Sequence, residues 1–117
     1  MGQPVVWFEV IGSDRASLLR FYEQMFDWKS TDADGAPYSM IDTGAGEGIN
    51  GGIGEPPPGR QGHVTFYVKV DDPGAALDRA AELGGSKLMG PMDMPDGSTV
   101  GLFTDPEGHV IGVHRPA

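Results

Sequence analysis

The chain has 117 residues, enough for one domain with a hydrophobic core. It contains no cysteine, which excludes disulfides, thiolate catalysis and cysteine metal sites. Its net charge of −9 at pH 7 opposes binding to a phosphate backbone, so we expect no nucleic-acid partner. No apolar run approaches the ~20 residues of a transmembrane helix, and no secretory signal pattern is present. We therefore expect no membrane partner and a cytoplasmic location.

The first half of the chain predicts one strand, one helix and three further strands. Residues 4–12 alternate between two faces, as a half-buried strand does, and Trp7 and Glu9 share one of these faces. Ser13 or Asp14 is the expected N-cap of a helix over residues 15–26. The helix carries large apolar residues at helical spacing that we expect in the core: Leu18, Tyr22 and Met25. The further strands are predicted at 28–31, 38–43 and 48–53, with Asp34-Gly35 as a hairpin turn between the first two.

The second half repeats this order. A strand over residues 63–70 is followed by a helix over 72–83, with an Asp N-cap, Pro73 in its first turn and Gly84-Gly85 at its end. One strand face is expected to pack on this helix: Val64, Phe66 and Val68. The mixed face is left to look into something else: His63, Thr65, Tyr67 and Lys69. Three more strands are predicted near 87–88, 99–104 and 109–114.

Two observations indicate an internal duplication. The sequence Glu47-Gly48 with Gly52-Ile53 recurs 60 residues later as Glu107-Gly108 with Gly112-Val113. The connector over residues 55–61, EPPPGRQ, separates the copies, because three successive prolines remove backbone donors. We therefore predict one α+β domain over residues 1–117, built from two βαβββ modules at about 4–54 and 62–115.

Three segments resemble the vicinal oxygen chelate superfamily, which includes glyoxalase I, bleomycin-resistance proteins and extradiol dioxygenases. They are DRASLLRFY at 14–22, the His63 strand leading into DDPGAALDRAAELG, and the terminal TDPEGHVIGV. The resemblance covers nearly the whole chain. It implies that the two modules curl into a cup-like open β-sheet, with helices outside and a ligand cavity within.

The resemblance also implies a divalent metal, held by the first and last strands of each module. His63 matches one ligand position, whereas the other three matching positions hold Trp7, Gly52 and Gly112. One ligand of four does not hold a catalytic metal, so we expect no metal and no other cofactor. A displaced site made of Glu9, His63 and His114 is the alternative, with Asn50 as a further possible donor.

Single residues also have a structural and a functional interpretation. His63 is expected to be a cavity histidine rather than a ligand, and Trp7 and Tyr67 are core residues or aromatic ligand walls. His109 is expected to serve the terminal turn. The loop carrying Met92 and Met94 should pack over the mouth of the cup, where flexible thioethers would suit a lid.

The favoured hypothesis is a protein that binds or sequesters a small molecule, aromatic or cationic, with Trp7, Glu9, His63, Thr65, Tyr67 and His114 as the ligand-binding residues. The alternative is a glyoxalase- or dioxygenase-type enzyme, that is, a lyase, isomerase or oxygenase. Such an enzyme would use a rearranged metal site, or Glu9 and His63 as a metal-free acid–base pair. A third possibility is a filled cup that acts through an interface. A homodimer is expected in each case.

Overall fold

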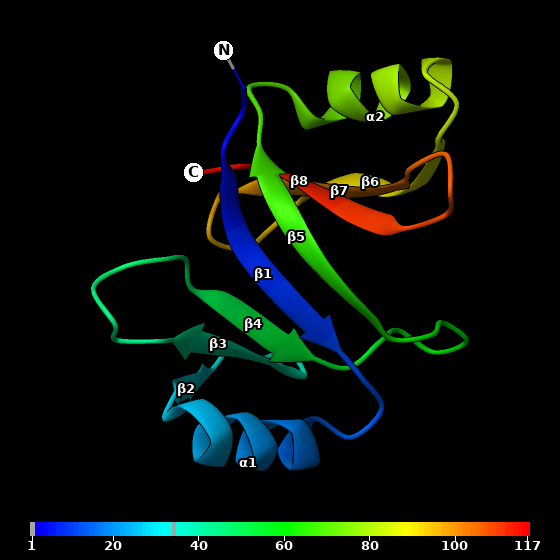
Figure 1. Ribbon diagram of the computed structural model, residues 1–117. Helices are drawn as coiled ribbons and strands as arrows, with labels where there is room; N and C mark the ends of the chain where they lie inside the picture. The colour runs from blue at the N-terminus through cyan, green and yellow to red at the C-terminus, as the bar shows by residue number, and fades with distance from the viewer. Residues whose placement is uncertain (1, 34) are drawn as a thin grey trace. The chain divides into compact units, whose positions relative to one another are not determined.

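The computed structural model describes residues 2–33 and 35–117. The chain divides into two compact units, one formed by Trp7–Val64 and the other by Thr65–Ala117 with the residues before Trp7. The division falls within the first and fifth strands, and every contact described below lies within one unit or the other. The elements follow one another as βαβββ twice (Figure 1), as the sequence predicts.

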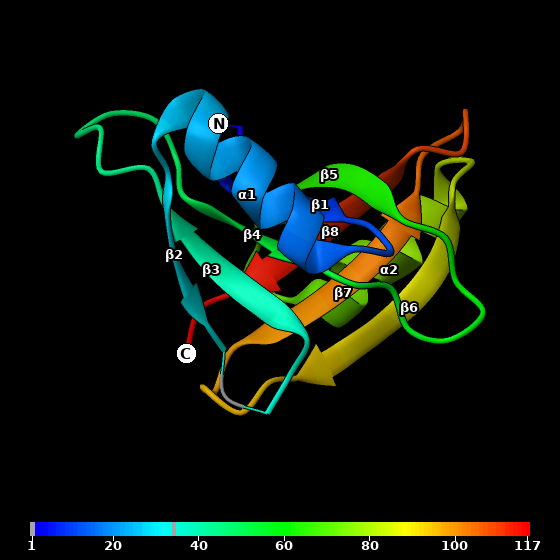
Figure 2. The ribbon, with the colours of Figure 1, turned by 90° about the horizontal axis from the view of Figure 1, so that it is seen from below.

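The first module contains five elements: β1 (Val5–Ile11), α1 (Arg15–Phe26), β2 (Lys29–Asp32), β3 (Tyr38–Asp42) and β4 (Gly51–Gly54). Its strands lie in the order β2-β3-β4-β1, with β1 parallel to β4 and the other pairs antiparallel. Figure 2 shows β2, β3 and β4 side by side. The register places Glu9 opposite Gly52 and Tyr38 opposite Gly54.

The second module has the same arrangement: β5 (His63–Lys69), α2 (Pro73–Glu82), β6 (Ser86–Asp93), β7 (Thr99–Thr104) and β8 (Val110–Arg115). Its strand order is β5-β8-β7-β6, and β5 runs parallel to β8 with Tyr67 opposite Gly112. Glu9 and Tyr67 therefore occupy equivalent positions beside the two repeated glycines. The repeat read from the sequence is a structural repeat as well.

Both helices begin where the sequence places their caps. The Asp14 carboxylate accepts a hydrogen bond from Ser17 N at 3.0 Å, and Asp72 accepts one from Ala75 N at 3.1 Å. These bonds satisfy backbone donors that have no partner inside the first helical turn. The predicted Asp34-Gly35 turn includes a residue outside the described part of the chain, but β2 and β3 pair antiparallel on either side of it.

The prediction for the two faces of β5 is wrong for two residues. Val64 is 76% exposed and Phe66 is also exposed, whereas Thr65 and Tyr67 are buried. Only Val68 packs against the buried cluster of the second module. The physical reason for Phe66 is that α2 contacts β6, β7 and β8, so the helix covers the far strands of the module more than β5.

Two further expectations need correction. Helix α1 contains no fully buried residue, and Met25 is 62% exposed rather than part of a core; Leu18 and Tyr22 are half-buried. The predicted loop over Met92 is a strand instead, because β6 continues to Asp93 through two register shifts against β7. A methionine lid built on Met92 is therefore not supported.

Each module has its own small core. In the first, Ile41 and Ile53 are buried, and a group of aromatic rings fills the space between α1 and β1. In the second, Leu77 of α2 packs against Val70 and Val113. These apolar contacts hold each helix onto its own sheet, because burial of apolar surface is the main favourable term in folding.

Candidate functional site

The polar face of β1 forms a connected group of side chains with β3 and the first residue of β5. Trp7 Nε1 donates to Tyr38 Oη at 2.9 Å, and Tyr38 Oη donates to Glu9 Oε1 at 3.1 Å. The second carboxylate oxygen, Glu9 Oε2, lies 3.0 Å from His63 Nε2. We call Trp7, Glu9, Tyr38 and His63 the Glu9 cluster. It joins residues that are up to 56 positions apart in the sequence.

Glu9 is the centre of this cluster and is only 7% exposed. A buried carboxylate is costly unless hydrogen-bond donors surround it, and here each oxygen has one. Glu9 thus holds the Tyr38 hydroxyl on one side and the imidazole on the other. Trp7, Tyr38 and His63 are each half-buried, so Glu9 is the one fully buried member of the cluster.

Tyr38 reaches Glu9 because the neighbouring strand has no side chain in between. A Cβ atom at Gly52 would overlap the Tyr38 ring and its hydroxyl. Gly52 is also the position at which the family resemblance implies a metal ligand in the first module. The space of that ligand is taken by the Tyr38 ring, whose hydroxyl donates a hydrogen bond to Glu9.

The same surroundings keep Tyr38 protonated. Burial raises the pKa of Tyr38 well above its ordinary value, and the negative charge of Glu9 raises it further. A neutral phenol donates a hydrogen bond at every pH at which the protein is expected to be used. Tyr38 is therefore a fixed donor to Glu9, not a group that exchanges protons with a substrate near neutral pH.

Tyr38 is the member of the cluster that sequence reasoning misses. The predicted strand at 38–43 includes it, but nothing in its spacing links it to Trp7 or Glu9. The repeated glycine at position 52 is the only available signal, because a glycine inside a strand often marks a close approach by another group. The sequence predicts the positions of Trp7, Glu9 and His63 on their strand faces correctly.

The remaining predicted site residues belong to the second unit. Thr65 is buried and donates to the backbone carbonyl of Val110. Tyr67 is buried with its ring over Gly112, where a Cβ would overlap it. His114 is half-buried on β8. The structure thus brings together Trp7, Glu9 and His63, while a ligand role for these other three residues stays a prediction.

The donors available for a metal do not match the set that the family resemblance implies. The strand registers make Val5, not Trp7, the first-module equivalent of His63. Neither Val5 nor Trp7 has a side chain that can coordinate a metal ion. Tyr38 and Tyr67 cover the two glycines at the other ligand positions. Within each unit, the described residues include no group of three or more His, Asp or Glu side chains suited to a metal ion. The implied metal does not fit these residues.

His109 has the turn role predicted for it. Its ring Nδ1 lies 3.0 Å from Asp105 Oδ2, and its backbone N–H donates to Asp105 Oδ1. That backbone hydrogen bond is the main reason that the pKa of Asp105 is lowered. The terminal turn is therefore held by a side chain that stays ionised, and His109 is exposed on its outside.

The family assignment follows from the fold and from a family model. The model of the Glyoxalase/Bleomycin resistance protein/Dioxygenase superfamily matches residues 5–113. The chain belongs to this family, as the resemblance predicts. Neither described helix is long and apolar enough to cross a membrane.

Relatives and solved structures agree with this assignment. The chain is 32% identical to "Putative glyoxylase CFP32" of Mycobacterium bovis and of Mycobacterium tuberculosis, over 97% of this chain and 44% of each relative. The chain thus spans less than half the length of these relatives. Among solved structures, methylmalonyl-CoA epimerase from Mycobacterium tuberculosis matches with TM-score 0.66 at 13% identity, covering 97% of this chain and 87% of the other. A superfamily member from Vibrio splendidus matches with TM-score 0.65 at 14% identity, over 97% and 99%. These likenesses show the fold.

Proposed function

We propose that this protein binds a small molecule at the Glu9 cluster and does so without the metal typical of its family. The observation that supports this proposal is the hydrogen-bonded path from Trp7 through Tyr38 and Glu9 to His63. Its member Tyr38 fills the space beside Gly52, the position at which the family resemblance implies a metal ligand in the first module. The path presents preorganised polar groups next to aromatic rings, which is the usual composition of a small-molecule site.

The chemistry of the cluster favours an aromatic or cationic ligand. An indole ring attracts cations and stacks on planar groups. The Glu9 carboxylate adds a negative charge beside it, and His63 offers a hydrogen-bonding edge that Glu9 orients. Thr65, Tyr67 and His114 of the second module stay proposed ligand-binding residues. We further propose that the protein is cytoplasmic and forms a homodimer, with no nucleic-acid or membrane partner.

The chain contains two tryptophans, and only one belongs to the cluster. Trp28 stacks on Tyr22 beside α1, with ring centroids 5.4 Å apart. Benzoate, phenol and benzyltrimethylammonium serve as probes of anionic, neutral and cationic aromatic ligands. We expect at least one of them to quench tryptophan fluorescence saturably in wild type and in Trp28→Phe. In Trp7→Phe the quenching should disappear, because the reporting ring and the Tyr38 hydrogen bond are both removed.

The matched pair of variants makes this result decisive. Both replace tryptophan by phenylalanine, so a general loss of fluorescence or stability is controlled. Quenching that survives in Trp7→Phe and disappears in Trp28→Phe would place the ligand beside α1 and contradict the proposed site. Absence of saturable quenching with all three probes would count against an aromatic ligand.

A second candidate function is proton transfer, and the contact between Glu9 Oε2 and His63 Nε2 favours it. A carboxylate and an imidazole in direct contact can take up and return a proton at a carbon next to a carbonyl. The structural neighbour named methylmalonyl-CoA epimerase has the same fold. An enolate intermediate needs a hydrogen-bond donor to stabilise its negative charge. The Tyr38 hydroxyl is a neutral donor in the cluster, but it already donates its hydrogen bond to Glu9.

Glu9→Gln separates the two functions. The amide keeps the size of the side chain and its contact with Tyr38, but it cannot accept a proton as a base. For a binding protein we expect the affinity of the best probe to change by less than about tenfold, which corresponds to ~1.4 kcal/mol. For an enzyme, hydrogen–deuterium exchange of a 2-oxo or thioester substrate catalysed by wild type would fall by about 10²–10⁴-fold in the variant, while binding persists.

A further inference from the structure

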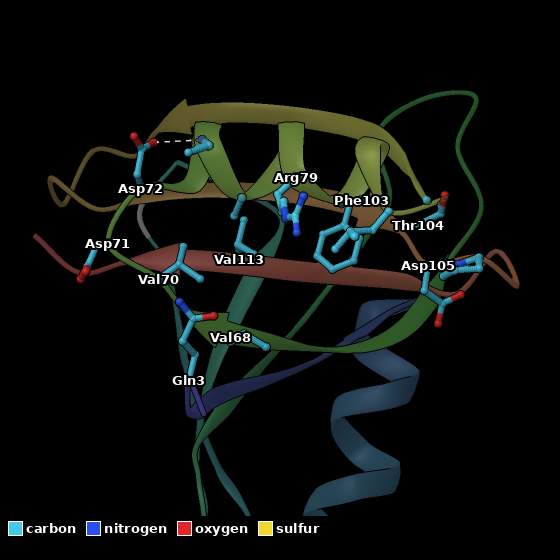
Figure 3. A pocket seen from close by; sticks show the side chains of 16 residues that line it. Gln3, Val68, Val70, Asp71, Asp72, Arg79, Phe103, Thr104, Asp105 and Val113 are labelled. Carbon is cyan, nitrogen blue, oxygen red and sulfur yellow. Dashed lines mark hydrogen bonds between the residues drawn. The ribbon is translucent and has the colours of Figure 1, made fainter. Parts of the chain in front are cut away.

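A groove lies between α2 and the sheet of the second module. Every residue that lines it belongs to the unit formed by Thr65–Ala117 and the residues before Trp7. Its volume is about 710 Å³, which lies within the ~300–1,000 Å³ range of small-molecule sites. Figure 3 looks into it, with α2 above and β8 and β5 below, and shows four apolar side chains around it: Val68, Val70, Val113 and Phe103. We call this space the α2 groove.

The helix of the first module shows which side chains α2 lacks. Counting from the two N-caps pairs three positions of the helices: Leu18 with Ala76, Leu19 with Leu77, and Tyr22 with Ala80. None of these six residues is exposed, so the paired positions have similar surroundings. Leucine is kept at the second position, but α2 has alanine at the other two, and both alanines line the groove. The groove therefore includes the space of a leucine and a tyrosine side chain.

The turn after the helix shows the same difference. Both helices are followed by one residue with positive φ, Asp27 at 59° and Gly84 at 102°. The next residue is Trp28 in the first module and Gly85 in the second, where it lines the groove. A Cβ atom at Gly85 would overlap the carbonyl oxygen of Thr104. The space of the indole ring is therefore open, and a side chain at this position cannot fill it.

The side chains that the second module lacks form an aromatic stack in the first. Tyr22 and Trp28 have ring centroids 5.4 Å apart and an angle of 16° between their planes, and Phe8 packs against Trp28 at 5.1 Å. The strand registers make Phe103 the equivalent of Ile41, so the second module adds one ring at the groove. An aromatic molecule in the α2 groove can stack on Phe103, because aromatic rings favour offset-stacked contacts.

Arg79 can contact such a molecule from the other side. Figure 3 shows its guanidinium beside the Phe103 ring, and Arg79 lines the groove. Its ion pair with Glu82 is 3.7 Å long, and both side chains are 66% exposed. A pair of this kind holds the side chain weakly. The planar guanidinium is therefore available to stack on an aromatic face.

The residues around the groove favour an uncharged ligand. A charged group among the apolar side chains of the groove would lose its hydration without gaining a partner. A cationic ring would be repelled by Arg79. An anion would be repelled by the three carboxylates that line the groove: Asp71, Asp72 and Asp105.

We propose that the α2 groove is a second small-molecule site, which binds an uncharged planar aromatic molecule between Phe103 and Arg79. The ligand supplies the aromatic surface that Tyr22 and Trp28 supply in the first module. The Glu9 cluster belongs to the other unit, so this proposal does not rest on the function proposed above.

Fluorescence titration with N-phenyl-1-naphthylamine tests the site. This uncharged aromatic probe becomes more fluorescent in apolar surroundings, so wild type should give a saturable rise with one probe per chain. Ala80→Tyr restores the ring that the first module has at Tyr22 and should weaken probe binding by at least about tenfold. Ala81→Tyr is its control, because Ala81 is exposed and is not among the lining residues; this variant should bind the probe as wild type does.

Arg79→Ala tests the groove on its exposed side. This variant is expected to fold even if circular dichroism shows that Ala80→Tyr does not. Loss of a cation–π contact should weaken probe binding by about 2–5-fold. Arg20→Ala is the matched control, because Arg20 is an exposed arginine of α1 and should have no effect. Wild type without saturable binding, or binding that is unchanged in both Ala80→Tyr and Arg79→Ala, would overturn the proposal.

Competition with four molecules tests the class of ligand. We expect uncharged 2-naphthol to displace the probe at a lower concentration than 2-naphthoate, (2-naphthylmethyl)ammonium or 1-dodecanol. Stronger displacement by either charged naphthalene would contradict the choice of an uncharged ligand. Stronger displacement by 1-dodecanol would show that the groove takes an alkyl chain, and would overturn the aromatic assignment.

Trp7→Phe separates this site from the Glu9 cluster. The substitution lies outside the groove, so probe binding should persist. Binding that is lost in Trp7→Phe and retained in Ala80→Tyr would place the probe at the Glu9 cluster and overturn the proposal. Coverage of the groove by a second copy would reduce the probe bound per chain as the protein concentration rises, and this result would also overturn it.

Discussion

Gly52→Ala is expected to destabilise the protein and to disconnect the Glu9 cluster. A methyl group at this position would overlap the ring and hydroxyl of Tyr38, so the ring must move away from Trp7 and Glu9. Overpacking of this kind costs about 1–3 kcal/mol. Loss of the donor to a buried carboxylate adds to that cost. Urea unfolding followed by circular dichroism measures the change in the free energy of unfolding.

The Tyr38→Ala background is the control for this prediction. Without the ring, the added methyl group has space, so Gly52→Ala should cost much less there than in the wild-type background. The difference between the two costs is the coupling free energy of the pair. An equal cost in both backgrounds would mean that the Tyr38 ring does not lie over Gly52.

Leu77→Ala is expected to give the largest loss of stability among single substitutions in the second module. Leu77 is fully buried and packs against Val70 and Val113. Removal of a buried leucine side chain costs about 2–5 kcal/mol, because it removes apolar contacts and leaves a cavity. Val64→Ala is the control, since Val64 is 76% exposed. Its cost should stay within about 0.5 kcal/mol. Similar costs for both variants in urea unfolding would contradict the packing of α2 described here.

Most of the fold is readable from the sequence because its signals are local. Period-two alternation and the Asp caps give β1, β5 and both helices to within a residue or two. The 60-residue repeat predicts the duplication, which the matching registers of Glu9 with Gly52 and Tyr67 with Gly112 confirm. These features depend on neighbouring residues or on a simple comparison of two segments.

The wrong predictions concern burial and strand length, which depend on tertiary contacts and not on the local sequence. Alternation along β5 gives two faces, but it does not show that α2 lies over β6, β7 and β8, which leaves Phe66 exposed. Met25 has a spacing typical of a core position, yet it is 62% exposed. The prolines and glycines near Met92 suggest a loop, but pairing with β7 extends β6 through them.

The candidate site is predictable in part for the same reason. Trp7, Glu9 and His63 are found because each lies on a recognisable strand face. Tyr38 is missed because it comes from a different strand, and its role depends on the pairing of β3 with β4 and on the bare glycine beside it. Interactions between distant strands require the register, which the sequence does not specify by itself.

We propose that the Glu9 cluster stands in place of the family's metal site. Metal content of protein purified without chelator, followed by titration with Ni²⁺, Zn²⁺, Mn²⁺ and Fe²⁺ while the melting temperature is recorded, tests it most directly. A metal bound to the folded state raises its stability by mass action, so even micromolar affinity gives a measurable shift. We predict substoichiometric metal and no shift that depends on His63. One equivalent of metal, or a shift in wild type that His63→Ala abolishes, would contradict this account.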